Sequence, residues 1–179
     1  MSSNKISPST SEDLLHDPPG YIKPNMQDFQ LTDVGMVELK NDISQALEVQ
    51  YLSPAVFPST FPVKGHIFGK NHRLMINLAC SRQTEKEAPA VNIIFVVDTG
   101  SPDTFLSKDA MEALIGKKVE NLPSSLYVFI QEEERAIQCH LSPEHSHFAD
   151  VNVLGMDSIT DMGLMLAVNG KTKEFSLNK

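Results

Sequence analysis

Hydrophobic and polar positions divide the chain into a polar N-terminal stretch, one helical segment and a long series of short β segments. Residues 1–25 are rich in Ser, Pro, Asp and Asn, which predicts a mobile tail. Residues 31–52 carry apolar side chains near helical spacing, and this pattern predicts a helix that Thr32 or Asp33 caps and that Pro54 ends.

The stretch 57–62 contains two Phe-Pro pairs and predicts an extended linker, because residues before proline avoid the helical region. After residue 63, short apolar runs bounded by turn residues are typical of strands. The run 91–97 is almost entirely apolar, so we expect a strand buried on both faces. The other expected elements are strands at 73–80, 126–130, 135–141, 148–154, 164–168 and 171–177, a turn at 131–134, a helix at 108–115 and a short helix between Gly155 and Gly163.

Three local signals refine these elements. Ser107 is the predicted N-cap of the helix at 108–115, and Asp157 or Ser158 is the predicted cap of the later helix. Asn169-Gly170 is typical of a two-residue type I′ turn, so we expect it to join the last two strands.

Composition indicates one globular domain with an appendage: the chain has 179 residues, of which 41% are hydrophobic. A net charge of -8 disfavours nucleic acid as a partner, since phosphate binding requires clustered Lys and Arg. No stretch approaches the roughly 20 apolar residues of a membrane span, and the N-terminus lacks the apolar core of a secretory signal. Cys80 and Cys139 are predicted to be free thiols in a reducing compartment, which favours a cytoplasmic protein.

One short motif carries candidate chemistry. Asp98 ends the apolar run and is followed by Thr99, Gly100 and Ser101. A carboxylate at the end of a buried strand is costly unless it is paired or hydrogen-bonded, and a glycine lets the backbone turn tightly. Such a loop can aim a carboxylate into a cleft. The alternative is an Asx turn in which Asp98 only caps its own backbone.

The surrounding residues resemble the active-site segment of the retroviral-type aspartic proteases, the retropepsins. Residues 95–107 read FVVDTGSPDTFLS, and residues 151–163, VNVLGMDSITDMG, resemble the second signature of that family. The order and spacing of the two blocks match, as does the strand 74–79 ahead of the first. The resemblance covers residues 63–179. It implies an all-β fold, a closed acid-protease barrel half with one or two short helices, after an N-terminal extension over 1–62 that contains a helix.

The resemblance also implies a function. Since one such motif is found, each chain would supply one catalytic Asp98 to a homodimer. The two carboxylates would share a proton, so that the ionised one activates water and the protonated one polarises the peptide carbonyl. The expected protein is an aspartic endopeptidase that acts on extended polypeptides without cofactor or metal. The resemblance implies that Thr99 links the two loops, that Gly100 lets the backbone approach the substrate closely, and that Ser101 donates a hydrogen bond to the carboxylate. It also implies that Asp103 and Gly155 contact the substrate. The alternative for Asp103 is a solvated loop charge.

Two departures from the family pattern bear on activity. Pro102 and Met156 stand where viral members carry an ion-paired Asp and Arg, so both partners are absent together, as in cellular or retrotransposon members. The candidate flap, 115–125, has one glycine and no strand alternation, which favours weak catalysis. The alternative function is therefore a dimeric binding or assembly module that keeps the fold without useful catalysis.

Three further features have competing interpretations. The C-terminal hairpin, 164–177, is predicted to supply an intersubunit sheet, and the alternative is that it closes the monomer core. Phe61-Pro62 resembles the self-processing sites of viral relatives, although a stiff linker is the favoured interpretation. A zinc site is disfavoured for a cluster of polar residues that falls on a loop without a supporting cysteine, namely His140, Glu144, His145 and His147.

Overall fold

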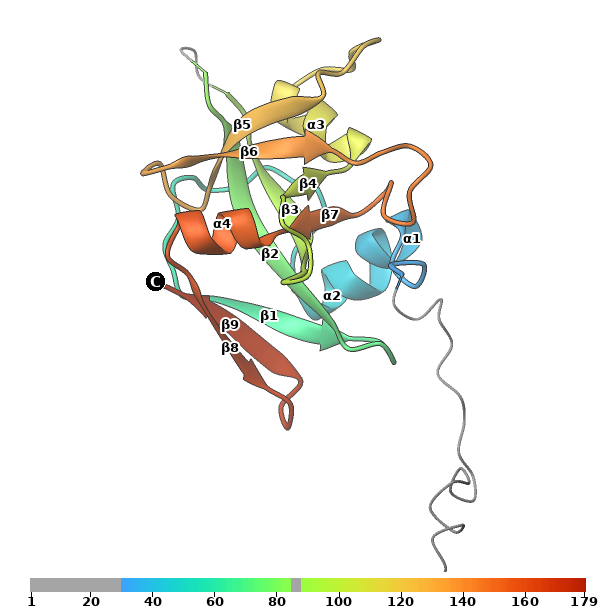
Figure 1. Cartoon of the computed structure of the whole chain (residues 1–179), viewed down its shortest axis with the longest axis vertical. Helices are drawn as coiled ribbons and strands as arrows, with labels where there is room; N and C mark the ends of the chain where they lie inside the picture. Colours follow the sequence, from blue (N-terminus) through green and yellow to red (C-terminus); the bar gives the residue numbers. More distant parts are fainter. Residues whose placement is uncertain (1–29, 85–87) are drawn as a thin grey trace, which may run out of the picture.

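The computed structural model describes residues 30–84 and 88–179, so the tail predicted at 1–25 lies outside the described residues. Figure 1 shows the elements in chain order. The strands are β1 (Val63–Phe68), β2 (Arg73–Arg82), β3 (Ala90–Val97), β4 (Phe105–Leu106), β5 (Ser125–Ile130), β6 (Ala136–Leu141), β7 (Asn152–Leu154), β8 (Met165–Asn169) and β9 (Glu174–Asn178). The helices are α1 (Met36–Glu38), the π-helical η3 (Leu39–Ile43), α2 (Ser44–Ala46), α3 (Lys108–Ile115) and α4 (Met156–Asp161).

Six strands close into a barrel, which confirms the expected mostly-β architecture. They follow the order β3-β7-β4-β6-β5-β2, and β2 pairs again with β3. The first half of β2 also pairs with β1, and the sheet continues from there through β9 to β8 at its edge (Figure 1). The pairs β3–β7 and β4–β6 are parallel, whereas the neighbours β4 and β7 are antiparallel.

Strand β3 is buried on both faces, as its apolar sequence predicts. Val91, Ile93, Phe95 and Val97 belong to the inner core, which fills the barrel. Ile94 and Val96 face the other way, into a second group of side chains that we call the outer cluster. The buried members of the outer cluster are Leu31, Val34, Leu39, Ile43, Tyr51, Met75, Ile94, Val96, Val151 and Val153.

The N-terminal helical segment is shorter than predicted, running from Met36 to Ala46. Its N-cap is Gly35, not Thr32 or Asp33, because the Asp33 carboxylate instead accepts hydrogen bonds from Arg73 at the start of β2. The helix also ends before Pro54, since Glu48 and Leu52 adopt positive φ angles of 53° and 58°.

Other boundaries differ for local reasons. Strand β7 begins at Asn152, not 148, because turn hydrogen bonds such as Val151 N to Phe148 O occupy the preceding loop. Neither Asp157 nor Ser158 caps α4, whose N-cap is Gly155. The last hairpin closes through residues 170–173, not through a two-residue turn, since Asn169 pairs with Glu174.

The cap that Ser107 provides to α3 is confirmed by the hydrogen bond that its hydroxyl accepts from Ala110 N, at 3.3 Å. The hairpin of β5 and β6 is confirmed as well. None of the helices within residues 30–84 and 88–179 has the length and apolarity that a membrane crossing requires.

Candidate active site

Parallel pairing of β3 with β7 brings the two sequence signatures side by side. Val97 lies opposite Leu154 in the register. Three backbone hydrogen bonds continue the contact beyond the strands: Asp98 N donates to Leu154 O at 3.1 Å, Met156 N to Ser101 O at 2.9 Å, and Asp157 N to Pro102 O at 3.1 Å. The loop that carries Asp98 is therefore fixed against the start of α4.

The Asp98 carboxylate lies at the end of a buried strand and is itself half-buried. Its Oδ1 accepts a hydrogen bond from Gly100 N at 2.9 Å, and its carbonyl accepts one from Ser101 N at 3.1 Å. This is the Asx turn that the alternative interpretation expects, and it fixes the carboxylate relative to the backbone. A Cβ on Gly100 would lie 3.2 Å from Oδ1, so glycine makes room for this contact. Thr99 and Gly100 are exposed beside it.

The expected hydrogen bond from the Ser101 hydroxyl to the Asp98 carboxylate does not form in the described chain. The hydroxyl donates to the carbonyl oxygen of Asp103 at 2.7 Å, because the loop curls back and offers a nearer acceptor. Asp103 itself is exposed. Its backbone passes so close to Gly155 that a Cβ there would lie 2.3 Å from Asp103 O. In the described chain Gly155 is thus a packing position for the loop, and substrate contact by Asp103 and Gly155 stays a prediction.

A buried link between Thr104 and Asp157 holds the two segments together, and sequence reasoning did not find it. The Thr104 hydroxyl donates to Asp157 Oδ1 at 2.6 Å, and Thr104 N donates to Oδ2 at 3.0 Å. The same hydroxyl oxygen accepts from Gly155 N at 3.1 Å and lies 2.6 Å from Ser158 Oγ. Thr104 is fully buried. No local signal in the sequence pairs Thr104 with Asp157, which lies 53 residues later.

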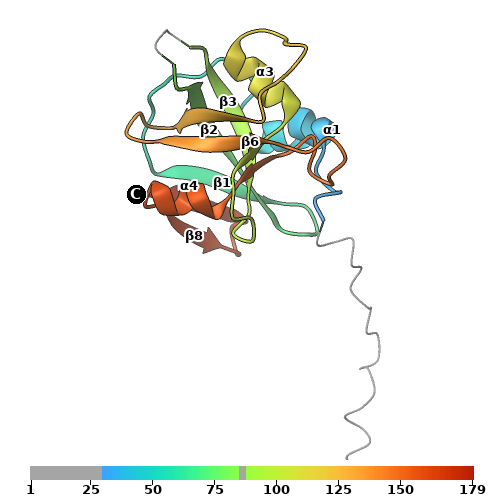
Figure 2. The same cartoon turned by 45° about the horizontal axis from the view of Figure 1, so that its top comes forward.

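The candidate flap does not lie over Asp98. After α3 ends at Ile115, residues 119–122 line a cavity of about 330 Å³ together with Lys108 and residues of the 141–150 stretch. In both Figure 1 and Figure 2 this loop lies beyond α3, at the end of the barrel away from the β3–β4 loop.

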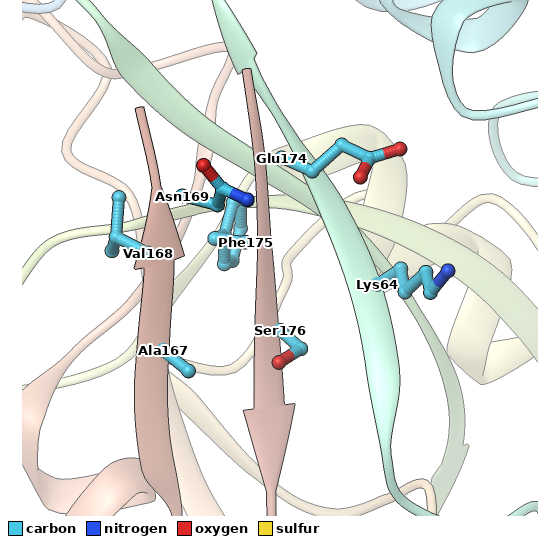
Figure 3. A pocket seen from close by; sticks show the side chains of 7 residues that line it. All are labelled: Lys64, Ala167, Val168, Asn169, Glu174, Phe175 and Ser176. Atoms are coloured by element: carbon cyan, nitrogen blue, oxygen red, sulfur yellow. The ribbon is translucent and has the colours of Figure 1, made fainter. Parts of the chain in front are cut away.

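The two strands of the C-terminal hairpin have different surroundings. Strand β9 pairs with β1 and buries Phe175 and Leu177 in the inner core, as the alternative interpretation expects. Strand β8 is the edge strand of the sheet, and its residues Met165 and Val168 are 63% and 54% exposed. Val168 lines a shallow pocket of about 240 Å³ with Lys64 of β1 and the first part of β9. Figure 3 shows the side chains around this pocket.

The other residues that the sequence analysis singled out, namely the histidines, Phe61 and the two cysteines, contact parts of the chain other than Asp98. The exposed His147 accepts a hydrogen bond from Leu31 N through Nδ1, at 3.0 Å, and His140 contacts the Phe105 ring. Phe61 is half-buried against the inner core. Burial raises the pKa of both thiols, Cys80 and Cys139, which are free and fully buried.

Comparison with known proteins finds similarity among solved structures. No family model matches the chain, and none of the curated proteins matches it. The crystal structure of a retropepsin-like aspartic protease from Rickettsia conorii is similar over 67% of this chain and 95% of its own, with 23% identity and a TM-score of 0.40. Because a TM-score this low does not establish a common fold, the proposals below rest on the contacts of the chain's own residues.

Proposed function

We propose that this chain is an aspartic endopeptidase that acts as a homodimer, with Asp98 of each copy in one shared site. The observation that carries the proposal is the position of Asp98: it ends a strand buried on both faces, and hydrogen bonds fix its loop against the start of α4. A carboxylate held this firmly beside an exposed Thr99 and Gly100 is suited to meet a second copy of itself.

The chemistry follows from the pairing of two carboxylates. Two facing Asp98 carboxylates cannot both be charged at low cost, so the pair holds one proton between its two side chains. The ionised carboxylate takes a proton from water as the water attacks the peptide carbonyl carbon. The protonated carboxyl donates its proton to the carbonyl oxygen, which gives a gem-diol. The carboxyl that took the proton from water passes it to the leaving nitrogen as the peptide bond breaks, and one gem-diol hydroxyl returns its proton to the other carboxylate. The exposed Thr99 hydroxyl is placed to link the two loops, and an extended polypeptide is the expected substrate.

A second candidate function is a dimeric binding or assembly module of the same fold without useful catalysis. Two observations favour it. The loop at 119–122 lines a cavity with residues 141–150 and not with the Asp98 loop, so it is not in place to exclude water from a bound peptide. Pro102 also lacks the backbone N–H that could hold a substrate at that position.

The experiment is peptide cleavage by wild type, Asp98→Asn and the control Asp109→Asn, whose side chain is exposed on α3. A diverse peptide mixture is read by mass spectrometry from about pH 4 to pH 7, the range in which a shared carboxylate pair acts. We expect cleavage by wild type and by Asp109→Asn, suppressed by a transition-state-mimicking inhibitor, and none by Asp98→Asn. Equal results for all three proteins, in samples shown to be dimeric, would favour the binding module.

A further inference from the structure

Residues 30–53 cover the outer face of the strand that carries Asp98. Leu31, Val34, Leu39 and Ile43 are almost fully buried in the outer cluster, against Met75 of β2, Ile94 and Val96 of β3 and residues 151–153. Figures 1 and 2 show α1 and α2 against the same side of β2 and β3. The segment is therefore part of the packing around the candidate site, and we call it the strap.

The strap is fixed at both of its ends. At the first end, Arg73 donates to the Asp33 carboxylate at 2.8 and 3.0 Å, and Asn71 donates to it at 2.9 Å. At the second end, Leu52 N donates to Asn92 O, and Asn92 N donates to Ser53 O, at 3.0 and 2.8 Å. These bonds tie the strap to the first residues of β2 and β3.

Between these ends, the side chain of Tyr51 reaches from the strap to polar groups of the barrel. The hydroxyl of Tyr51, a residue that is 6% exposed, accepts a hydrogen bond from Asn152 Nδ2 at 3.0 Å and lies 3.3 Å from Ser107 Oγ. Asn152 is fully buried and bridges three elements: its Nδ2 also donates to Ile94 O in β3, and its Oδ1 accepts from Ser107 N before α3. One N–H of the buried Asn152 amide has its partner only while the tyrosine hydroxyl is present.

Asn152 lies in the strand pair that ends at the candidate catalytic residue. It is opposite Phe95 in the β3–β7 register, and two residues later Leu154 accepts the backbone hydrogen bond from Asp98 N. Whatever holds Asn152 in place thus holds the end of the short strand β7 that fixes the Asp98 loop.

We infer that the strap is a built-in support of the candidate active site and that Tyr51 is a positioning residue, which acts on Asp98 through Asn152 and the β3–β7 pair. The inference rests on the proposed function for its effect on catalysis, although the support of the strand pair can be measured independently. Removal of the hydroxyl leaves one N–H of the buried Asn152 amide without its partner, which raises the frequency with which the strand pair opens.

The test compares Tyr51→Phe with Tyr127→Phe, the same substitution at a tyrosine that is 53% exposed on β5. Amide hydrogen exchange of the full-length protein is measured residue by residue, and cleavage is measured as separate kcat and KM values. For Tyr51→Phe we expect exchange at the Asp98 amide to rise about tenfold, the effect of one unsatisfied buried group, with a fall in kcat at unchanged KM. Tyr127→Phe is expected to match wild type in both.

Two results would overturn the inference. One is equal exchange at the Asp98 amide in the two variants. The other is a fall in global stability for Tyr51→Phe with no change in kcat, since that would make the tyrosine merely structural. If wild type cleaves no peptide, the proposed function fails, and the exchange comparison alone decides whether Tyr51 supports the Asp98 loop.

Discussion

Strands β3 and β8 are both rich in apolar residues, AVNIIFVV against MLAVN, yet they have opposite environments. The chain itself covers both faces of β3, with the barrel interior on one side and the strap on the other. Strand β8 is a sheet edge on which Met165, Ala167 and Val168 are exposed. An exposed apolar edge strand is a ready site for pairing with another chain. The apolar residues of β3 are therefore explained by burial within one chain, whereas those of β8 favour the proposed dimer.

The largest expected effect concerns the outer cover of β3. Leu39→Ala removes a fully buried side chain from the outer cluster, and we expect the free energy of unfolding to fall by about 2–5 kcal/mol. The control is Val37→Ala, two residues away and 68% exposed, with an expected change within about 0.5 kcal/mol. Urea denaturation measures both. Similar values for the two variants would mean that the strap contributes little to the stability of β3.

The next effect concerns the link at the end of β3. Thr104→Val keeps the shape of the side chain and removes its hydroxyl. Gly155 N then loses its acceptor, and Asp157 Oδ1 keeps only the hydrogen bond from Ser158 N. We expect a loss of about 2–3 kcal/mol in the free energy of unfolding. Thr104→Ser retains the hydroxyl and serves as the control. If the serine variant loses as much as the valine variant, the methyl group and not the hydrogen bonds stabilises this link.

A smaller, pH-dependent effect is expected where the strap meets β2. Burial raises the pKa of Asp33, but the hydrogen bonds and charge of Arg73 outweigh it, so the net pKa is lowered. A lowered pKa in the folded state means that the pair stabilises the protein above the ordinary aspartate pKa of about 3.9 and loses this effect as the pH falls further.

The measurement compares wild type with Asp33→Asn from neutral pH to about pH 3. We expect a difference of about 1 kcal/mol near neutrality that shrinks with acidification. A difference that is constant with pH would show that the amide and the carboxylate interact with Arg73 equally well.

The smallest effect on stability is expected at β8, together with a large effect on assembly. Val168→Lys adds a charge to an exposed edge position, so the stability of one chain is expected to change by no more than about 0.5 kcal/mol. The dimer dissociation constant is expected to rise at least about tenfold, since a lysine on the edge opposes strand pairing. Sedimentation at tens of micromolar measures this, with Val56→Lys, 86% exposed in the 54–62 stretch, as the control. A dimer of unchanged affinity would place the interface elsewhere.

Sequence reasoning succeeded where the signal was local. Helix α3 was predicted with its bounds and with Ser107 as its cap, and in the structure Gly116 ends it in the left-handed region at φ 80°. The β5–β6 hairpin and the buried strand β3 were predicted from short apolar runs and a polar turn. The assignment of Asp98 as the catalytic residue also comes from consecutive residues, and it stays a prediction.

Sequence reasoning failed where the determining contact was distant. Apolar residues at 31–34 and 49–52 fit helical spacing, but they contact the outer face of the sheet as non-helical backbone, so periodicity identified the covered face and not the conformation. Asp157 was interpreted as a helix cap because a cap is a local feature, whereas its partner Thr104 lies 53 residues earlier. Tyr51 and Asn152 are 101 residues apart, and neither has a local signal for the other.

Gln131 has a consequence for the less favoured interpretation of Phe61-Pro62 as a self-processing site. This residue is buried and has a φ of 63°. Its carbonyl oxygen accepts a hydrogen bond from Ser59 N, and its side-chain Nε2 donates to Thr60 O. Its backbone N–H donates to Ala79 O, and its Oε1 accepts from Ala79 N. A chain cut at Phe61-Pro62 would consequently remain one particle, since the upstream piece is still hydrogen-bonded here and buried in the outer cluster. Such a nicked protein would give two bands on a denaturing gel and a single, unshifted peak in size-exclusion chromatography.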